Sequence, residues 1–222
     1  MSFKVYIVFD NVCVKEGFRK GFGFSALVYN KLSQNYVLFD TGGDGNTLTY
    51  NLNKFGIKIR DISKVVISHN HGDHAGGLEG IYEKNPEIEI YIPDNLSSYK
   101  RHYSKSQITH NEQMEEIDQN IYTSGTFGRS IKEQALYLKR PAGDWIVLVG
   151  CTHPGLEQFL IKARESAEIY AVIGGFHGFR RFSYLEGIAF IGACHCTQHR
   201  DKIARKFPET FRKVCVGDKF SF

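Results

Sequence analysis

Short apolar runs of strand length recur along the whole chain. They are rich in β-branched and aromatic residues, and Gly, Asp, Asn or Pro stands at many of their ends, which is typical of β-strands. The runs that we predict to be strands are Val5–Phe9, Ser25–Tyr29, Tyr36–Phe39, Lys64–Ser68, Ile88–Ile92, Ala135–Leu138, Trp145–Val149, Tyr170–Ile173, Gly187–Ile191 and Lys213–Val216.

Helical segments separate some of these runs. Leu156–Ser166 has apolar residues at helical spacing, and Asn46–Phe55 follows a Gly-rich turn. Gln198–Lys206 follows Thr197, whose hydroxyl can cap a helix N-terminus. The early strands follow one another without helices, whereas the later strands alternate with helices. This order predicts an α/β (α+β) protein made of packed sheet and helix layers.

Residues Ser97–Gly128 differ from the rest of the chain because they are polar and only weakly periodic. We interpret them as an insertion or a lid, helical in part. The 222 residues suffice for one large α/β domain, and we predict a single domain over residues 1–222.

Composition narrows the class of protein. Hydrophobic residues make up 42% and charged residues 23%, as in ordinary globular proteins. The net charge of +4 suits a small anionic substrate and is too weak to argue for a nucleic-acid partner. No apolar run approaches the roughly 20 residues of a membrane-spanning helix, and the first residues do not resemble a signal peptide. We therefore expect a cytoplasmic protein without a membrane partner; a homo-oligomer stays open.

The five cysteines, Cys13, Cys151, Cys194, Cys196 and Cys215, are odd in number and widely spread. This pattern favours reduced thiols over a disulfide framework.

Potential metal ligands follow the apolar run Lys64–Ser68. His69, His71, Asp73 and His74 lie within six residues, where a turn can direct them into one pocket. Imidazole and carboxylate ligands suit zinc, iron and manganese. The alternative is a His-rich loop that only caps a helix, and so dense a cluster disfavours it.

Three further histidines stand just past the ends of later strands, where ligands collect in α/β sheets. We predict that His153 and His195 bind metal, although a lone histidine is more often structural. His177 is either a ligand or a catalytic residue that contacts the substrate. Cys151 precedes His153 by two residues and could bind metal, support a ligand or simply pack.

The motif His69-x-His71-x-Asp73-His74, together with the upstream Leu38-Phe39-Asp40-Thr41-Gly42, resembles the metallo-β-lactamase superfamily. This resemblance implies a four-layer αββα sandwich with metals at one edge and Asp40 bracing the metal loop. It also implies the ligand sets. His69, His71 and His153 would hold the first metal; Asp73, His74 and His195 would hold the second.

Later motifs resemble one branch of the superfamily, which includes the archaeal dihydropterin ribofuranosylaminobenzene-phosphate synthase. Its members carry GCSH, GGFH and HCTG where this chain has Gly150–His153, Gly174–His177 and His195–Gln198. Cys151 stands where the superfamily usually has a bridging Asp, so a standard carboxylate bridge is in doubt. Asn70 and Gln198 also depart from the usual residues and border the site.

These motifs predict an enzyme with one or two divalent transition metals, zinc first and iron or manganese as alternatives. Asp73 would orient the attacking water and take its proton, and His177 would protonate the leaving group or hold the substrate. Arg180 and Arg181 could bind a phosphate, or form a solvated surface pair.

Several functions share such a site. We expect a hydrolase of small phosphorylated or ester-like compounds, with a pterin-related synthase as the alternative. A nuclease, a di-iron protein that reduces oxygen or nitric oxide, and a non-catalytic metal-binding protein are less favoured. The weak net charge counts against the nuclease and the absence of a flavin domain against the di-iron protein.

Overall fold

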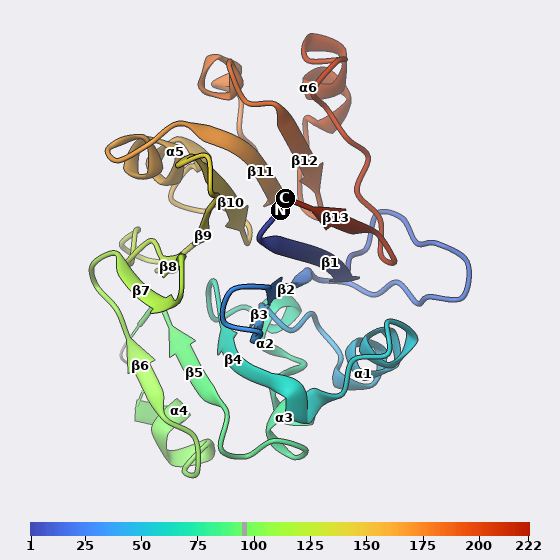
Figure 1. Ribbon diagram of the computed structural model, residues 1–222, viewed down its shortest axis with the longest axis vertical. Helices are drawn as coiled ribbons and strands as arrows, with labels where there is room; N and C mark the ends of the chain where they lie inside the picture. Colours follow the sequence, from blue (N-terminus) through green and yellow to red (C-terminus); the bar gives the residue numbers. More distant parts are fainter. Residues whose placement is uncertain (95–96) are drawn as a thin grey trace.

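The computed structural model describes residues 1–94 and 97–222, which form two sheets (Figure 1). The first sheet has the order β13 (Lys219–Ser221), β1 (Phe3–Phe9), β2 (Ser25–Asn30), β3 (Tyr36–Phe39), β4 (Ile62–Val66), β5 (Glu89–Ile92) and β6 (Ile108–His110). The second has the order β12 (Phe190–Cys194), β11 (Ile169–Gly175), β10 (Trp145–Val149), β9 (Leu136–Lys139), β8 (Ile121–Thr123) and β7 (Glu115–Asp118).

The two sheets pack face to face around one apolar layer. Val5 and Phe39 from the first sheet share this layer with Leu148 and Ile173 from the second, and all four are fully buried. Burial of apolar surface stabilises such a layer by about 25 cal/mol per Å² removed from water. The inner layer therefore holds the two halves of the protein together.

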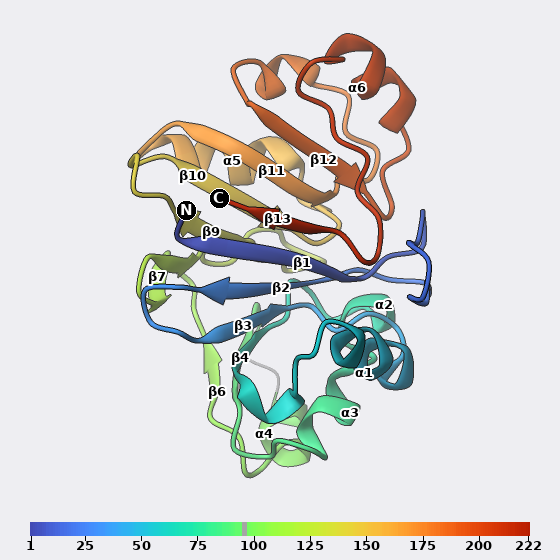
Figure 2. The same ribbon diagram turned by 45° about the vertical axis from the view of Figure 1, so that its right-hand side comes forward.

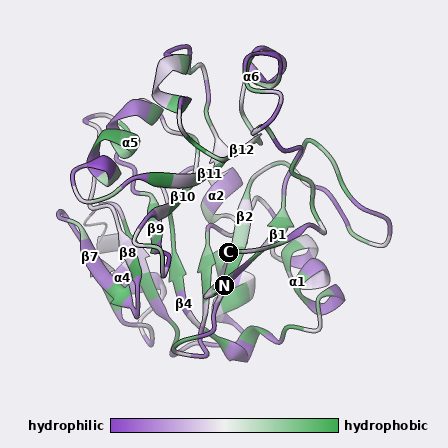
Figure 3. Cartoon of the chain, turned by 45° about the horizontal axis from the view of Figure 1, so that its top comes forward, coloured by the Kyte–Doolittle hydropathy of each residue, from purple (hydrophilic) through white to green (hydrophobic). Residues whose placement is uncertain are grey.

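Helices cover the outer face of each sheet, which confirms the predicted αββα sandwich (Figure 2). The first sheet is covered by α1 (Gly45–Lys54), α3 (Leu78–Tyr82) and α4 (Ser97–His102). The second is covered by α5 (Leu156–Arg164) and α6 (Arg200–Lys206). Figure 3 shows hydrophobic residues along strands such as β1 and β4, whereas α5 carries both hydrophobic and hydrophilic residues.

The sandwich explains why the strands are apolar on both sides. Along β1, Val5 and Ile7 face the other sheet, whereas Tyr6 and Val8 face the helices. Alternate side chains of a strand point to opposite faces, so a strand buried on both faces appears as a continuous apolar run.

Most predicted strands are confirmed, and two require correction. Lys213–Val216 is not a strand, because it pairs only through an isolated bridge between Val216 and Val14. The last strand is instead β13, which pairs antiparallel with β1. The run predicted at Gly187–Ile191 forms β12 three residues later, where a ladder with β11 becomes available.

The last helix was also predicted to begin too early. α6 starts at Arg200, with His199 as its N-terminal cap residue and no side-chain capping bond. The Thr197 hydroxyl bonds elsewhere, since it donates to the Cys194 carbonyl oxygen at 2.7 Å and accepts from the Phe176 amide at 2.9 Å. The supposed cap therefore joins the ends of β11 and β12.

Residues 97–128 supply parts of both sheets. They contribute α4, then β6 at the edge of the first sheet, then β7 and β8 at the edge of the second. The predicted helical part is confirmed by α4. The role of this segment as a lid stays a prediction.

A disulfide joins Cys13 to Cys215, so the prediction that all cysteines are reduced was wrong for these two. Their Cα atoms lie 4.7 Å apart, although 202 residues separate them in sequence. Spacing along the chain could not reveal this pair, because β1 and β13 bring the two ends together only in the folded sheet (Figure 1). Cys151, Cys194 and Cys196 are free. Within the described residues, no helix is long and apolar enough to cross a membrane.

Candidate metal centre

The loops that carry the predicted ligands meet at one edge of the sandwich. In the first sheet β1, β3 and β4 run in the same direction, because β1 and β3 are both antiparallel to β2 and β4 is parallel to β3. In the second sheet β10, β11 and β12 are parallel. The carboxyl ends of parallel strands share an edge, which is where ligand sites form.

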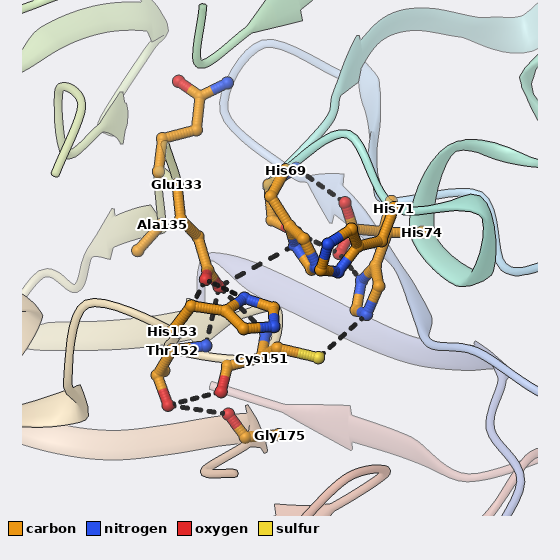
Figure 4. A network of polar contacts seen from close by, with 12 residues as sticks. His69, His71, His74, Glu133, Ala135, Cys151, Thr152, His153 and Gly175 are labelled. Carbon is orange, nitrogen blue, oxygen red and sulfur yellow. Dashed lines mark hydrogen bonds and ion pairs between the residues drawn. The ribbon is translucent and has the colours of Figure 1, made fainter. Parts of the chain in front are cut away.

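All six predicted metal ligands come together there, in two groups. Within each group, one ligand atom per residue lies within 4.8 Å of all the others. The first group consists of His69, His71 and His153 (Figure 4). The second group consists of Asp73, His74, Cys151 and His195. Cys151, whose role the sequence left open, thus belongs to the second group.

Nitrogen atoms converge in the first group. His69 Nε2 lies 3.1 Å from His71 Nδ1, and the His153 ring centroid lies 4.6 Å from that of His69. Ligands about 2.0–2.1 Å from a tetrahedral zinc ion are separated by about 3.3 Å, so this spacing fits a shared metal.

The second group combines oxygen, nitrogen and sulfur ligands. His74 Nε2 lies 3.1 Å from His195 Nε2 and 3.2 Å from Cys151 Sγ. Asp73 Oδ2 lies 3.4 Å from His195 Nε2. Most of these atoms are buried, and a cation between them would satisfy all four. The residues present therefore fit a second metal.

Oxygen acceptors hold the far side of the His74, His195 and His153 rings. Asp40 Oδ2 accepts from His74 Nδ1 at 2.6 Å, Asn11 Oδ1 accepts from His195 Nδ1 at 2.7 Å, and Glu133 Oε2 accepts from His153 Nδ1 at 3.0 Å. Such partners select the tautomer and orientation of metal-binding histidines, leaving Nε2 free for the metal.

The Ser68 hydroxyl supports His69 in the same way. It donates to Asp40 Oδ2 at 2.7 Å, so the oxygen accepts from His69 Nδ1, which lies 2.9 Å away. Asp40 Oδ1 also accepts from the Ser68 amide at 2.6 Å. The structure thus confirms that Asp40 braces the metal loop.

The histidines of the site differ in their affinity for protons. Burial lowers the pKa of His69 and of His71, and it lowers the pKa of His195 to about 4. Burial also opposes the charged form of His74, but the adjacent Asp40 carboxylate outweighs it and raises the pKa of that ring. Burial thus favours the neutral, metal-binding form of His69, His71 and His195, whereas Asp40 favours protonation of His74.

Glu133 is a central residue of the site that sequence reasoning did not assign. It precedes β9 in the sequence and is fully buried. Its carboxylate accepts hydrogen bonds from the backbone amides of Cys151, Thr152 and His153 at 2.7–2.8 Å (Figure 4). It therefore positions the whole turn after β10. The available signal was an acidic residue three positions before an apolar strand.

Asp10 was missed in the same way. It follows β1, and its Oδ1 accepts from the His195 amide at 2.9 Å. Burial raises the pKa of its carboxyl to about 6. With the neighbouring Asn11, it ties the loop after β12 to the first sheet.

Cavities open on two sides of the first group. One of about 680 Å³ lies beside His71, between α2 (Gly72–Ala75) and α4, and its wall includes Tyr99, Arg101 and Tyr103. Another of about 320 Å³ lies beside His153 and the N-terminus of α5, and its wall includes His177 and Arg180.

His177 lies outside both ligand groups, with its ring centroid 5.3 Å from that of His153. Its position agrees with a substrate contact better than with a metal ligand. Arg181 also lines this cavity and pairs with Glu157 at 3.3 Å, with its side chain 67% exposed.

Comparisons with known proteins agree with this geometry. The family model of the metallo-beta-lactamase superfamily matches residues 19–163, so the chain belongs to that superfamily. An uncharacterized protein of Methanocaldococcus jannaschii is 26% identical over 207 residues, covering 78% of each chain.

The 7,8-dihydropterin-6-methyl-4-(beta-D-ribofuranosyl)-aminobenzene-5'-phosphate synthase of the same organism is 24% identical over 249 residues, covering 84% of each chain. The chain is thus a distant homologue of this synthase. Among solved structures, the metallo-beta-lactamase fold protein YhfI from Bacillus subtilis superposes with a TM-score of 0.70 at 12% identity, covering 99% of each chain. That likeness supports the fold alone.

Proposed function

We propose that this protein is a metal-dependent hydrolase of small anionic compounds, phosphorylated or ester-like. The observation that carries the proposal is the convergence of two ligand groups, one of imidazoles and one of mixed ligands, beside open cavities. Zinc is the first choice of metal, and iron or manganese also suits these ligands. A bound metal supplies Lewis acidity, which makes water a competent nucleophile at neutral pH and stabilises developing negative charge.

Within this scheme, the residues of the chain have distinct roles. Asp73 is the most exposed member of the second group, so its carboxylate can orient the attacking water and take its proton. His177, beside His153, can donate a proton to the leaving group or hold the substrate. Arg180, in the same cavity, can bind an anionic group.

A synthase acting on a pterin and a ribosylated aminobenzene phosphate is the second candidate. It is supported by the 84% coverage of the Methanocaldococcus jannaschii synthase. Both candidates can take a phosphorylated substrate, so only turnover distinguishes them. The net charge of +4 gives a nuclease no comparable support.

The test is reconstitution followed by turnover. Protein stripped of metal is loaded with Zn²⁺, Mn²⁺ or Fe²⁺ and assayed on p-nitrophenyl phosphate, bis(p-nitrophenyl) phosphate and p-nitrophenyl acetate. We expect hydrolysis of at least one ester only in loaded protein, and loss of the first-group metal and of activity in His71→Ala. His102→Ala is the matched control for metal content, because this exposed histidine pairs with Glu79 and belongs to neither group. Failure to retain any metal after reconstitution would refute the proposal.

A further inference from the structure

Phe22 is exposed beside the metal centre. The residue is 72% exposed. Among the large hydrophobic residues that are exposed in the described part of the chain, Phe22 alone is aromatic. Its ring centroid nevertheless lies 6.1 Å from that of His195, a member of the second ligand group. A substrate bound at the candidate metal centre would therefore lie close enough to remove this apolar ring from water.

The backbone around Phe22 is closely fitted to the metal loop. A Cβ at Gly23, where φ is +136°, would lie 2.1 Å from the Asp73 carbonyl oxygen. A Cβ at Gly21 would lie 2.5 Å from the Phe9 ring, and one at Gly43 would lie 2.6 Å from the Phe22 carbonyl oxygen. Only glycines permit this approach, so the sequence around Phe22 is built to bring its backbone against Asp73.

Hydrogen bonds hold the same loop at both ends. The Gly21 amide donates to the Asp10 carbonyl oxygen, and the Phe24 amide donates to the Asp73 carbonyl oxygen, both at 3.2 Å. The Cys13–Cys215 disulfide anchors the earlier part of the loop. The ring of Phe22 thus projects from a backbone that is fixed relative to both Asp73 and His195.

We propose that Phe22 binds a flat aromatic or heteroaromatic group of the substrate, whose anionic group lies at the metal centre. This inference rests on the proposed function and narrows its substrate class to aryl compounds. A backbone fixed in advance loses little conformational freedom on binding, so burial of the ligand ring against the Phe22 ring favours binding. Stacked aromatic pairs gain further energy beyond the area that they bury.

The test measures binding of two phosphonates that cannot be hydrolysed as esters. Zinc-loaded protein is titrated with phenylphosphonate and with methylphosphonate by calorimetry. We expect the wild type to bind phenylphosphonate about tenfold more tightly, the size of a stacked ring contact. Phe22→Ala should reduce this preference to within about twofold and leave methylphosphonate binding unchanged.

Phe18→Ala is the matched control. Phe18 lies on the same loop, but its ring packs against Phe55 at a centroid distance of 4.7 Å. This variant should keep the tenfold preference, and thermal unfolding checks that both variants are folded. A phenyl preference that survives in Phe22→Ala, equal binding of the two phosphonates, or no binding of either would overturn the inference. Loss of self-association in Phe22→Ala with an unchanged phenyl preference would also overturn it and assign the ring to an interface between copies.

These outcomes are independent of turnover. A protein that shows the Phe22-dependent preference but hydrolyses no ester would sustain the aryl site and refute the hydrolase. A protein that hydrolyses esters but whose phenylphosphonate binding does not depend on Phe22 would sustain the hydrolase and refute the aryl site.

Discussion

The two ligand groups differ in chemistry, access and support. The first group consists of imidazoles, and its member His71 lines the larger cavity. The second group adds a thiol and a carboxylate and is mostly buried. Glu133 supports His153 of the first group and the Cys151 amide of the second, whereas Asp40 supports His74 directly and His69 through Ser68. Two adjacent sites built from one edge of a sandwich can therefore differ in metal preference, since softer ligands favour softer metals.

The largest expected effect comes from removing the support of the first group. Glu133→Ala deletes a buried carboxylate that accepts three backbone amides and His153 Nδ1. We expect the free energy of unfolding to fall by about 3–5 kcal/mol, measured by urea denaturation of metal-free protein. Glu157→Ala, on α5, is the control, because its carboxylate pairs with the exposed Arg181, and it should change the free energy of unfolding by less than about 1 kcal/mol. A small effect of Glu133→Ala would mean that water replaces the carboxylate.

The pH dependence of His195 comes next. Burial lowers the pKa of this ring to about 4, below its ordinary value of 6.5, so the unfolded chain binds the extra proton. Its contribution to stability is therefore complete above pH 6.5 and is lost as the pH falls toward 4. Across that interval the loss is about 3 kcal/mol in metal-free protein.

The raised pKa of Asp10 changes the free energy of unfolding with pH in the opposite direction, so the effect of His195 must be measured as a difference between two proteins. Subtracting the unfolding free energies of His195→Gln from those of the wild type, over pH 4 to 7, isolates the histidine. A difference that stays constant with pH would contradict the lowered pKa of His195.

Cys151→Ala tests the chemical contrast between the groups. Removing the thiol should weaken zinc binding at the second group by at least roughly 10–100-fold, the loss of affinity expected when a residue that only hydrogen-bonds a ligand is removed. Manganese binding should weaken less. The first group should keep its metal, so equilibrium dialysis should find one tight site in place of two. Cys194→Ala is the matched control, since this buried cysteine belongs to neither group. Unchanged zinc binding would exclude Cys151 as a ligand.

The smallest expected effect concerns Tyr99, which borders the large cavity. Its hydroxyl donates at 2.8 Å to Oδ1 of Asn70, which stands between His69 and His71 in the sequence. Tyr99→Phe removes one neutral hydrogen bond, so stability should fall by about 0.5–1.5 kcal/mol. Calorimetric unfolding would measure this, and metal binding at the second group should not change. An equal change at both groups would show that they are not independent.

Much of the site could be predicted from local sequence. His69, His71, Asp73 and His74 lie close together along the chain, and alternation and turn geometry alone bring them to one loop. The strand runs were recognisable because burial on both faces leaves a continuous apolar pattern. The errors fall where pairing is non-local, as at Lys213–Val216 and at the Cys13–Cys215 disulfide.

By itself, the sequence determined the superfamily, the layered fold and the residue types around the metals. Only the tertiary structure decided that Cys151 lies in the second ligand group and that His177 lies in neither. It also decided the roles of Glu133 and Asp10, which support histidines 20 and 185 residues away in sequence. The physical reason is that a buried carboxylate acquires its role from the donors that folding brings to it, and no local pattern encodes those donors.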